Sequence, residues 1–345
     1  MCDKVKYGRI TYYDVNSELT EYTNIGDWCQ TFAIDNLYEK LGVSKSDIID
    51  INRSELPTYK GEKLLVVIQA DCRQLDRRDF FPLSDDIVPV YLGIHRTEKK
   101  HILNSIDRFT EIIGCRDEAT CIMFKSLGYN AFISGCLTLT LPKRPEIGDY
   151  TELYLVDVPH EINKYIPSAY AGHVHKVTHE IFNSKNPEDE SRKIYDEYRR
   201  KARLVVTSRL HCLVPCLAMG IPVVLVRKYY DDRYGFVEKY VKPYLVEELS
   251  EINWDVEPVD VDEIKLLIMD VAKSMINKKV SSEGWHINDL SQEMKKLDIY
   301  YDKRKRVQYE SPFMTKMYYR INRISPKLAR FIRLKLLVRF TVIEK

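Results

Sequence analysis

The chain has 345 residues and a formal net charge of +2 at pH 7, with 45% hydrophobic and 30% charged residues. This is ordinary globular composition, and it excludes a disordered or fibrous chain. The length predicts two domains, each large enough to bury a core of its own.

The first half of the sequence alternates strand-like and helix-like segments. The continuous apolar run at 64–68 is typical of a buried parallel strand. Asp27 followed by Gln30 fits a capping box, and Gly42 is expected to end the helix that begins there. We expect strands at 10–13, 64–68, 88–94, up to 113 and at 131–134, and helices at 27–41 and 117–127.

The second half repeats this rhythm. We expect strands at 153–158, 175–178, 204–207 and 221–226, and helices at 188–201, 209–219 and 260 to about 276. Strands that alternate with helices predict parallel sheets with right-handed crossovers. The sequence therefore predicts an α/β protein of two Rossmann-like domains that face a cleft. Proline and glycine cluster at 142–149, which suggests an N-terminal domain at 1–145, a C-terminal domain at 146–300 and a tail at 301–345.

Two segments share one design, at 113–120 and at 206–211. Each is a buried strand, then a short turn with an arginine, Arg116 or Arg209, then a helix. Ligands of open α/β sheets bind at the carboxyl ends of strands, and helix starts favour anions there. The arginines add planar donors that match carboxylate and phosphate oxygens, and His211 falls in the first helical turn. A ligand with both groups, such as phosphoenolpyruvate, suits two such turns. The structural alternative is that Arg116 pairs with a neighbouring acid, Asp117 or Glu118.

Four sequence blocks resemble the polysaccharide pyruvyl transferase family. They appear in the family's order and span about residues 24 to 275. The blocks are Asn24-Ile-Gly-Asp27, Gly114-Cys-Arg-Asp-Glu-Ala-Thr120, Gly135-Cys-Leu-Thr-Leu-Thr-Leu-Pro142, and Thr207-Ser-Arg-Leu-His211 with Gly220-Ile-Pro-Val223. The third and fourth blocks are specific, whereas the first is weak by itself. The resemblance does not cover the residues before 24 or after about 300.

The resemblance implies a fold like that of B-type glycosyltransferases, and a role in capsule or exopolysaccharide biosynthesis. It implies phosphoenolpyruvate as the donor and a hexose diol, of galactose or mannose type, as the acceptor of a cyclic ketal. Arg116, Arg209 and His211 would hold the donor through their side chains, and Leu210 through its backbone. No metal and no cofactor other than this co-substrate is expected.

The chemistry of ketal formation requires an acid that protonates the methylene carbon of the donor. We assign this role to His211, whose imidazolium a trianionic donor would favour. The alternative is that His211 binds phosphate without transferring a proton. Asp27 is a second catalytic candidate, as a base or as a group that orients sugar hydroxyls, although the capping box would explain it structurally.

Four further residues are candidates for the acceptor side of the cleft. Asn24 and Gly26 precede the first helix, His95 follows a predicted strand, and Arg233 follows the strand that ends at 226. For His95 the simpler interpretation is a surface histidine.

Two other patterns are weaker. His173, His175 and His179 invite a zinc hypothesis, but there is no nearby cysteine and the strand-to-helix transition would spread the rings, so we interpret them as solvated or core side chains. The basic run at 303–306 is interpreted as a solvated face, and no nucleic-acid partner is expected.

The tail carries an uneven share of the charge. Residues 312–345 hold nine Lys or Arg and one acid, a net charge of +8. Within 312–343, apolar side chains recur at spacings of three and four, which is typical of a basic amphipathic helix on an anionic membrane. The sequence start lacks an apolar signal region. We therefore expect a cytoplasmic protein held at the inner face of the membrane, near a polyprenyl-diphosphate-linked acceptor. The alternative is that the stripe packs on the body or forms a dimer contact.

Two other functions remain open at this stage. One is glycosyl transfer from a nucleotide sugar, which the same architecture supports. It needs an acidic residue at the ribose, and Glu238, Glu247 and Glu248 are the available candidates. The other is a non-catalytic assembly protein at the membrane, against which the intact Arg116, Arg209 and His211 argue.

Overall fold

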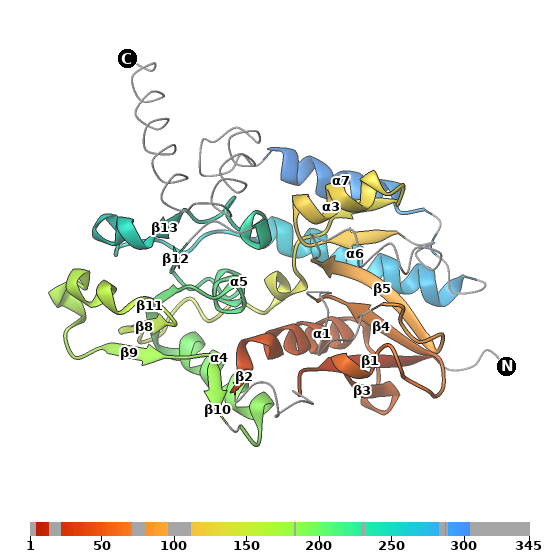
Figure 1. Ribbon diagram of the computed structural model, residues 1–345, viewed down its shortest axis with the longest axis horizontal. Helices are drawn as coiled ribbons and strands as arrows, with labels where there is room; N and C mark the ends of the chain where they lie inside the picture. The colour runs from red at the N-terminus through yellow and green to blue at the C-terminus, as the bar shows by residue number, and fades with distance from the viewer. Residues whose placement is uncertain are drawn as a thin grey trace, which may run out of the picture.

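A computed structural model describes residues 5–13, 22–70, 81–95, 112–182, 184–228, 232–282, 287 and 289–303. It shows a mixed α/β protein with two parallel sheets flanked by helices (Figure 1). The expected basic tail at 312–343 lies outside the described residues.

The first sheet has six strands in the order β3-β1-β4-β5-β6-β7, and every neighbouring pair is parallel. Its central strand β4 is buried at every position, as its apolar run predicts. The strands are β1 Lys6–Thr11, β3 Ile48–Asn52, β4 Leu64–Ile68, β5 Ile87–Ile94, β6 Ile113–Cys115 and β7 Ala131–Ile133.

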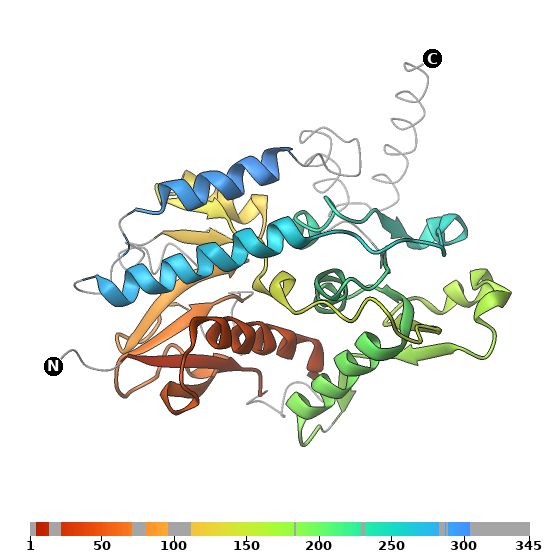
Figure 2. The ribbon, with the colours of Figure 1, turned by 180° about the vertical axis from the view of Figure 1, so that it is seen from behind.

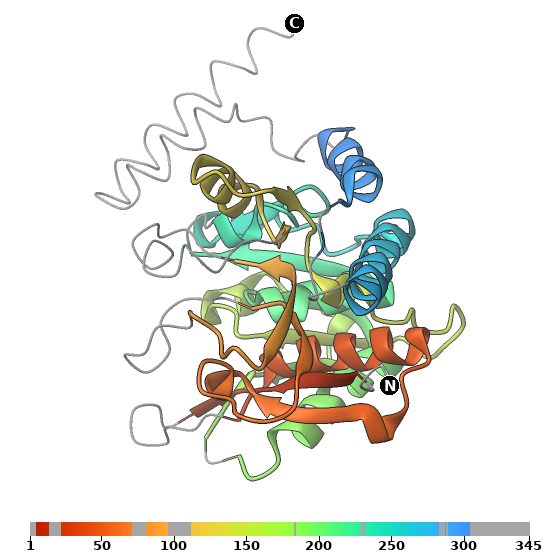
Figure 3. The same cartoon turned by 90° about the vertical axis from the view of Figure 1, so that its right-hand side faces the viewer.

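Helices cover both faces of this sheet. Helices α1 (Trp28–Leu41), α6 (Asp262–Ser281) and α7 (Ser291–Lys303) lie on one side, and α3 (Glu118–Ser126) lies on the other (Figure 3). Helix α1 ends at Gly42 in the left-handed conformation with φ of 72°, as predicted. The core is therefore a buried sheet between two helical layers.

The second sheet has five strands in the order β13-β12-β11-β8-β9, again all parallel. Strand β9 lies on one side of β8, whereas β11, β12 and β13 follow one another on its other side. The sheet therefore has a topological switch point between β8 and β11. Ligands bind at such switch points in open α/β sheets. The elements are β8 Glu152–Val156, β9 Val174–Val177, α4 Pro187–Lys201, β11 Ala202–Thr207, α5 Leu210–Met219, β12 Val223–Arg227 and β13 Pro243–Leu245.

Several contacts join the two halves of the chain. Strand β2 (Tyr22–Asn24), from the first half, pairs antiparallel with β10 (Glu180–Phe182), from the second. Helix α6 follows the second sheet in the chain but extends back across the first half, as Figure 2 shows, and α7 packs on β7. The short 3-10 helix at Leu137–Thr140, inside the third sequence block, packs against α1, α5 and α6.

The alternation of strands and helices is confirmed for the residues described. The sequence analysis did not identify β3, β10, β13 or α7. Three of these elements are short strands whose sequences show no marked alternation of apolar and polar residues. Whether such a segment forms a strand depends on the neighbouring strands with which it pairs. The predicted capping box at Asp27 is wrong. Asp27 has helical backbone angles and makes no side-chain cap to α1, and Gln30 instead donates to the Asp27 carbonyl oxygen.

Candidate functional site

Arg116 lies in the turn between β6 and α3 and is only 2% exposed. Its Nε donates to the Gly93 carbonyl oxygen at 3.2 Å, and its Nη2 donates to Gln30 Oε1 at 3.4 Å. Within the described part of the chain no carboxylate forms an ion pair with it. Taking a charge out of water without a counter-charge is costly. The buried guanidinium therefore provides a charge that an anionic ligand would balance.

The neighbouring acid has a different partner. Asp117 caps α3 by accepting from the Thr120 backbone N–H at 2.9 Å, and its Oδ2 lies 2.6 Å from His95 Nδ1. The proposed pairing of Arg116 with Asp117 is not formed. His95 is buried at the carboxyl end of β5, so the interpretation of a surface histidine is wrong.

Arg209 lies between β11 and α5 and is held by two acids. Its Nε donates to Asp157 Oδ2 at 2.9 Å, and its Nη2 pairs with Glu180 of β10. Asp157 follows β8 in the left-handed conformation, with φ of 51°, and also accepts the His179 backbone N–H at 3.0 Å. Strained backbone of this kind tends to occur at functional sites. The two carboxylates fix the orientation of the Arg209 fork.

One side-chain contact between the two halves joins His211 to Asp27. His211 Nδ1 lies 2.6 Å from Asp27 Oδ1. His211 is the second residue of α5 and has a non-helical ψ of 15°. The other ring nitrogen, Nε2, is buried and has no hydrogen-bond partner among the described residues. The pair thus orients the imidazole and leaves Nε2 available to a ligand.

Burial and charge act on this pair in opposite ways. Burial raises the pKa of Asp27, but the hydrogen bond from His211 and the charges of Arg53 and Arg116 outweigh it, so the pKa is lowered overall. Burial lowers the pKa of His211, the Asp27 contact opposes this, and the charges of Arg116 and Arg233 lower it further. In the absence of ligand, the favoured state is a carboxylate that accepts from the Nδ1–H of a neutral ring. Arg116 and Arg233 are thus close enough to act on His211.

The loop before α1 packs against the same histidine. The Asn24 side chain accepts from the Gly26 N–H at 3.1 Å. A Cβ on Gly26 would lie 2.8 Å from His179 Nδ1 and 3.5 Å from His211 Cβ. Only glycine fits this approach without a shift of its neighbours. The structure therefore brings Asn24, Gly26, Asp27, Arg116, Arg209 and His211 into one region, with Arg233 at its edge.

His179 packs next to Gly26 in this region, and its buried ring should make the stability of the protein sensitive to acid. Its ring stacks on Tyr198, and burial lowers its pKa to about 4, from about 6.5 in an unfolded chain. The unfolded state binds the proton more readily, so the contribution is complete above pH 6.5 and is lost as the pH falls towards 4. We expect the free energy of unfolding, measured in urea, to fall between pH 7.5 and 5 by about 2 kcal/mol more in the wild type than in His179→Gln.

The exposed His160 is the matched control for this measurement. His160→Gln should keep the pH dependence of the wild type. An unchanged pH dependence in His179→Gln would contradict the assignment.

A cavity of about 250 Å³ opens at the carboxyl ends of β8, β11 and β12. It is lined by Asp157, Val158, Pro159, Ser208, Val226, Arg227 and Lys228. Its lining residue Asp157 contacts Arg209, and it lies at the switch point of the second sheet. The sequence analysis expected a ligand at the carboxyl end of β11, beside Arg209.

Sequence reasoning missed the residues that orient the site. Asp157, Gln30, His179 and Glu180 are distant in sequence from the arginines they contact or flank. One signal was available, because Asp157 is an acid at the carboxyl end of a predicted strand. The antiparallel pairing of β2 with β10 places Glu180 beside Asn24, and the Ile25 N–H donates to the His179 carbonyl oxygen at 2.9 Å.

The other histidines do not gather. His173 and His175 both contact Glu152, at 2.9 and 2.5 Å, and lie on the surface, whereas His179 is buried. Across the described ranges, no three His, Cys, Asp or Glu side chains are placed to hold a metal ion. Over the same ranges, every helix is too short or too polar to cross a membrane.

Two solved structures illustrate what the fold is similar to. An uncharacterized protein from Klebsiella pneumoniae shares 15% identity, with 67% of this chain and 87% of that chain covered and a TM-score of 0.40. A putative UDP-N-acetylglucosamine 2-epimerase from Listeria monocytogenes shares 11% identity, with 83% and 100% covered and a TM-score of 0.38. No curated protein matches the sequence.

The family comparison covers the strands and turns that build the site. The matched segment contains His95, Arg116, Asp157, Arg209 and His211, and ends with β12. Residues 91–227 of the chain match the model of the polysaccharide pyruvyl transferase family.

Proposed function

We propose that the protein transfers a pyruvyl group from phosphoenolpyruvate to two hydroxyls of a hexose, forming a cyclic ketal in capsule or exopolysaccharide biosynthesis. The observation that carries the proposal is the buried Arg116, which has no carboxylate partner in the described chain and acts on the His211–Asp27 pair. An anionic substrate supplies the missing counter-charge. The family match over 91–227 supports the same reaction class.

The donor has two anionic groups, and two arginines are available for them. Arg209 is oriented by Asp157 and Glu180, and Arg116 by Gly93 and Gln30. Planar guanidinium groups match carboxylate and phosphate oxygens. The start of α5, where Leu210 is the first helical residue, adds backbone donors and a favourable dipole. These groups bind the donor and stabilise the departing phosphate.

The reaction needs one proton at the methylene carbon of the donor. His211 Nε2 donates it, which leaves an oxocarbenium-like centre that one sugar hydroxyl attacks. The hydroxyl's proton returns to His211, and the second hydroxyl then displaces phosphate and closes the ketal, its own proton leaving with the phosphate. Burial lowers the pKa of His211 in the free protein. A trianionic donor next to the ring opposes that effect and favours the imidazolium.

Asp27 has a second role in this scheme. Its carboxylate accepts from His211 Nδ1 and so points Nε2 towards the donor. Asp27 is therefore a positioning residue, which also stabilises the imidazolium as the ring gains its proton.

The acceptor hexose would lie between His95 and the loop of Asn24 and Gly26, with Arg233 opposite. The proposed architecture is that of B-type glycosyltransferases.

The test is phosphate release from phosphoenolpyruvate in the presence of a panel of lipid-linked or aryl hexosides. We expect release that depends on the acceptor, with one ketal formed per phosphate, because both hydroxyls react at the same carbon. Consumption of a nucleotide sugar with no phosphate release from phosphoenolpyruvate would replace this function by glycosyl transfer.

We further propose that residues 312–343, outside the described part, hold the protein at an anionic membrane surface next to a polyprenyl-diphosphate-linked acceptor. Each basic residue near such a surface contributes about 1 kcal/mol. We expect the full-length protein to co-sediment with vesicles that contain phosphatidylglycerol at low salt, and to dissociate as salt screens the charges. Equal sedimentation with neutral vesicles, or none with anionic vesicles, would contradict this role.

A further inference from the structure

A second cavity lies at the opposite edge of the second sheet from His211. It has a volume of about 310 Å³, and its lining includes Arg203 and Leu204 at the start of β11 and Pro222 just before β12. His211 follows the carboxyl end of β11. We call this the linker cavity, because the two segments that connect the halves, at 144–150 and 254–258, supply most of its other walls. Its size is at the lower end for small-molecule sites.

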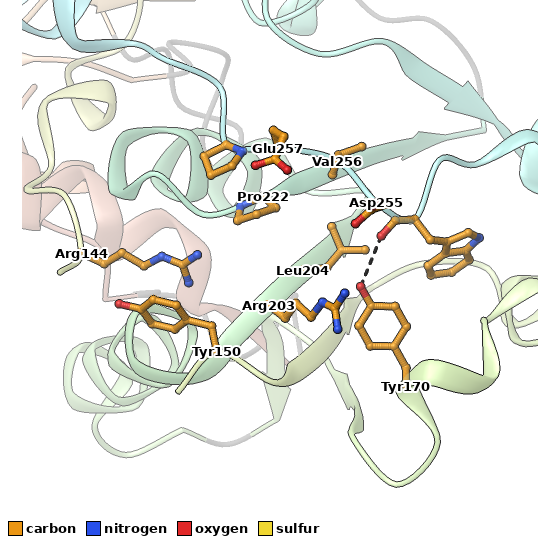
Figure 4. A pocket seen from close by; sticks show the side chains of 11 residues that line it. Arg144, Tyr150, Tyr170, Arg203, Leu204, Pro222, Asp255, Val256 and Glu257 are labelled. Atoms are coloured by element: carbon orange, nitrogen blue, oxygen red, sulfur yellow. Dashed lines mark hydrogen bonds between the residues drawn. The ribbon is translucent and has the colours of Figure 1, made fainter. Parts of the chain in front are cut away.

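Two arginines, Arg144 and Arg203, line the linker cavity. Arg144 donates to the Ala202 carbonyl oxygen and stacks on the Tyr150 ring at 3.7 Å, and Arg203 lies over the Tyr170 ring at 5.4 Å. Neither forms an ion pair with a carboxylate of the described residues. Figure 4 shows these four side chains around one hollow. Guanidinium groups in this state favour an anion with planar oxygens.

The same cavity also offers surfaces for a sugar ring. Tyr150 and Trp254 provide aromatic surfaces. Tyr170 is only 4% exposed, and its hydroxyl donates to the Trp254 carbonyl oxygen at 3.3 Å, which fixes the two residues relative to each other. Asp255 and Glu257 add carboxylate oxygens that can accept from hydroxyl groups. Guanidinium and carboxylate groups therefore lie around the aromatic side chains of the linker cavity.

We propose that the linker cavity binds a saccharide unit that carries a carboxylate. A simple anion would meet the like charges of Asp255 and Glu257 and would leave the aromatic faces unused. A neutral sugar would offer Arg144 and Arg203 no carboxylate oxygens for a bidentate contact. A hydroxylated ring with one carboxylate uses all three kinds of group. The inference does not depend on the proposed transfer reaction, because the linker cavity shares no residue with the transfer site.

The test is calorimetric titration of the full-length protein with three probes: methyl β-D-glucuronide, methyl β-D-glucoside and inorganic phosphate. We expect the glucuronide to bind, and the glucoside and phosphate to bind at least roughly tenfold more weakly, since each lacks one set of contacts. If the glucuronide does not bind, or if either of the other probes binds as tightly, the proposal is overturned.

Variants then locate the site. Arg203 is exposed, so its replacement should not disturb folding. Arg203→Gln should weaken glucuronide binding roughly tenfold, with Arg203→Lys intermediate. Arg199→Gln removes an equally exposed arginine of α4 and should bind as the wild type does. Unchanged binding in Arg203→Gln, or an equal loss in Arg199→Gln, would place the ligand elsewhere and overturn the assignment.

Discussion

His211→Ala is expected to reduce acceptor-dependent phosphate release by roughly 10²–10⁴-fold, which is the range for loss of a positioned acid. The side chain contacts Asp27 Oδ1 at 2.6 Å and leaves Nε2 as the one ring atom available to the donor. Phosphate release under single-turnover conditions measures the chemical step. The matched control is His175→Ala, a surface histidine of β9 that pairs with Glu152. Wild-type turnover by His211→Ala would contradict the role.

Asp27→Asn separates the two roles considered for His211. Removal of the carboxylate takes away the contact that raises the pKa of His211, so that pKa falls further. An acid must be protonated, and its activity is lost as pH rises through its pKa. For a general acid, the alkaline limb of the kcat profile should therefore move to lower pH in Asp27→Asn. If His211 only binds phosphate, KM for phosphoenolpyruvate should rise and kcat should not change.

The two substitutions should not be additive. Because Asp27 acts through His211, the double variant His211→Ala/Asp27→Asn should be about as slow as His211→Ala by itself. Additive losses would mean that Asp27 contacts the substrate directly, for example as the base for a sugar hydroxyl.

Gly135→Ala is expected to destabilise the protein by about 2–4 kcal/mol, from backbone strain and overpacking together. Gly135 has φ of 70°, and a Cβ there would lie 2.2 Å from Tyr301 Oη on α7. Tyr301 is 2% exposed, so its ring has little room to move away. The free energy of unfolding in urea measures the loss.

Two further variants divide this loss into its causes. Gly42→Ala has the same backbone conformation, with φ of 72°, but no atom within 4 Å of the added Cβ, so it measures the strain by itself. Tyr301→Phe in the Gly135→Ala background removes the hydroxyl and should restore part of the stability. A Gly135→Ala loss no larger than that of Gly42→Ala would show that α7 does not pack closely on the third sequence block.

The sequence by itself determined the parallel α/β class and the two arginine turns. These follow from local patterns, since β4 is a run of apolar residues and Arg116 and Arg209 each stand between a strand and a helix. A short apolar strand bounded by turn residues has few other ways to bury its surface. The resemblance suggested the reaction class, because spacing alone left the function of the arginines open.

The tertiary structure alone decided how these turns become a site. Asp27 satisfied a local capping rule in the sequence, yet its carboxylate turns to His211, which lies 184 residues away. His95 could have been a surface residue until the packing of β5 beside β6 paired it with Asp117. Long-range contacts of this kind leave no periodic signal, because a hydrogen bond or a charge depends on distance in space. The fold class can therefore be predicted from local sequence patterns, whereas the protonation and orientation of His211 depend on contacts that exist only in the folded protein.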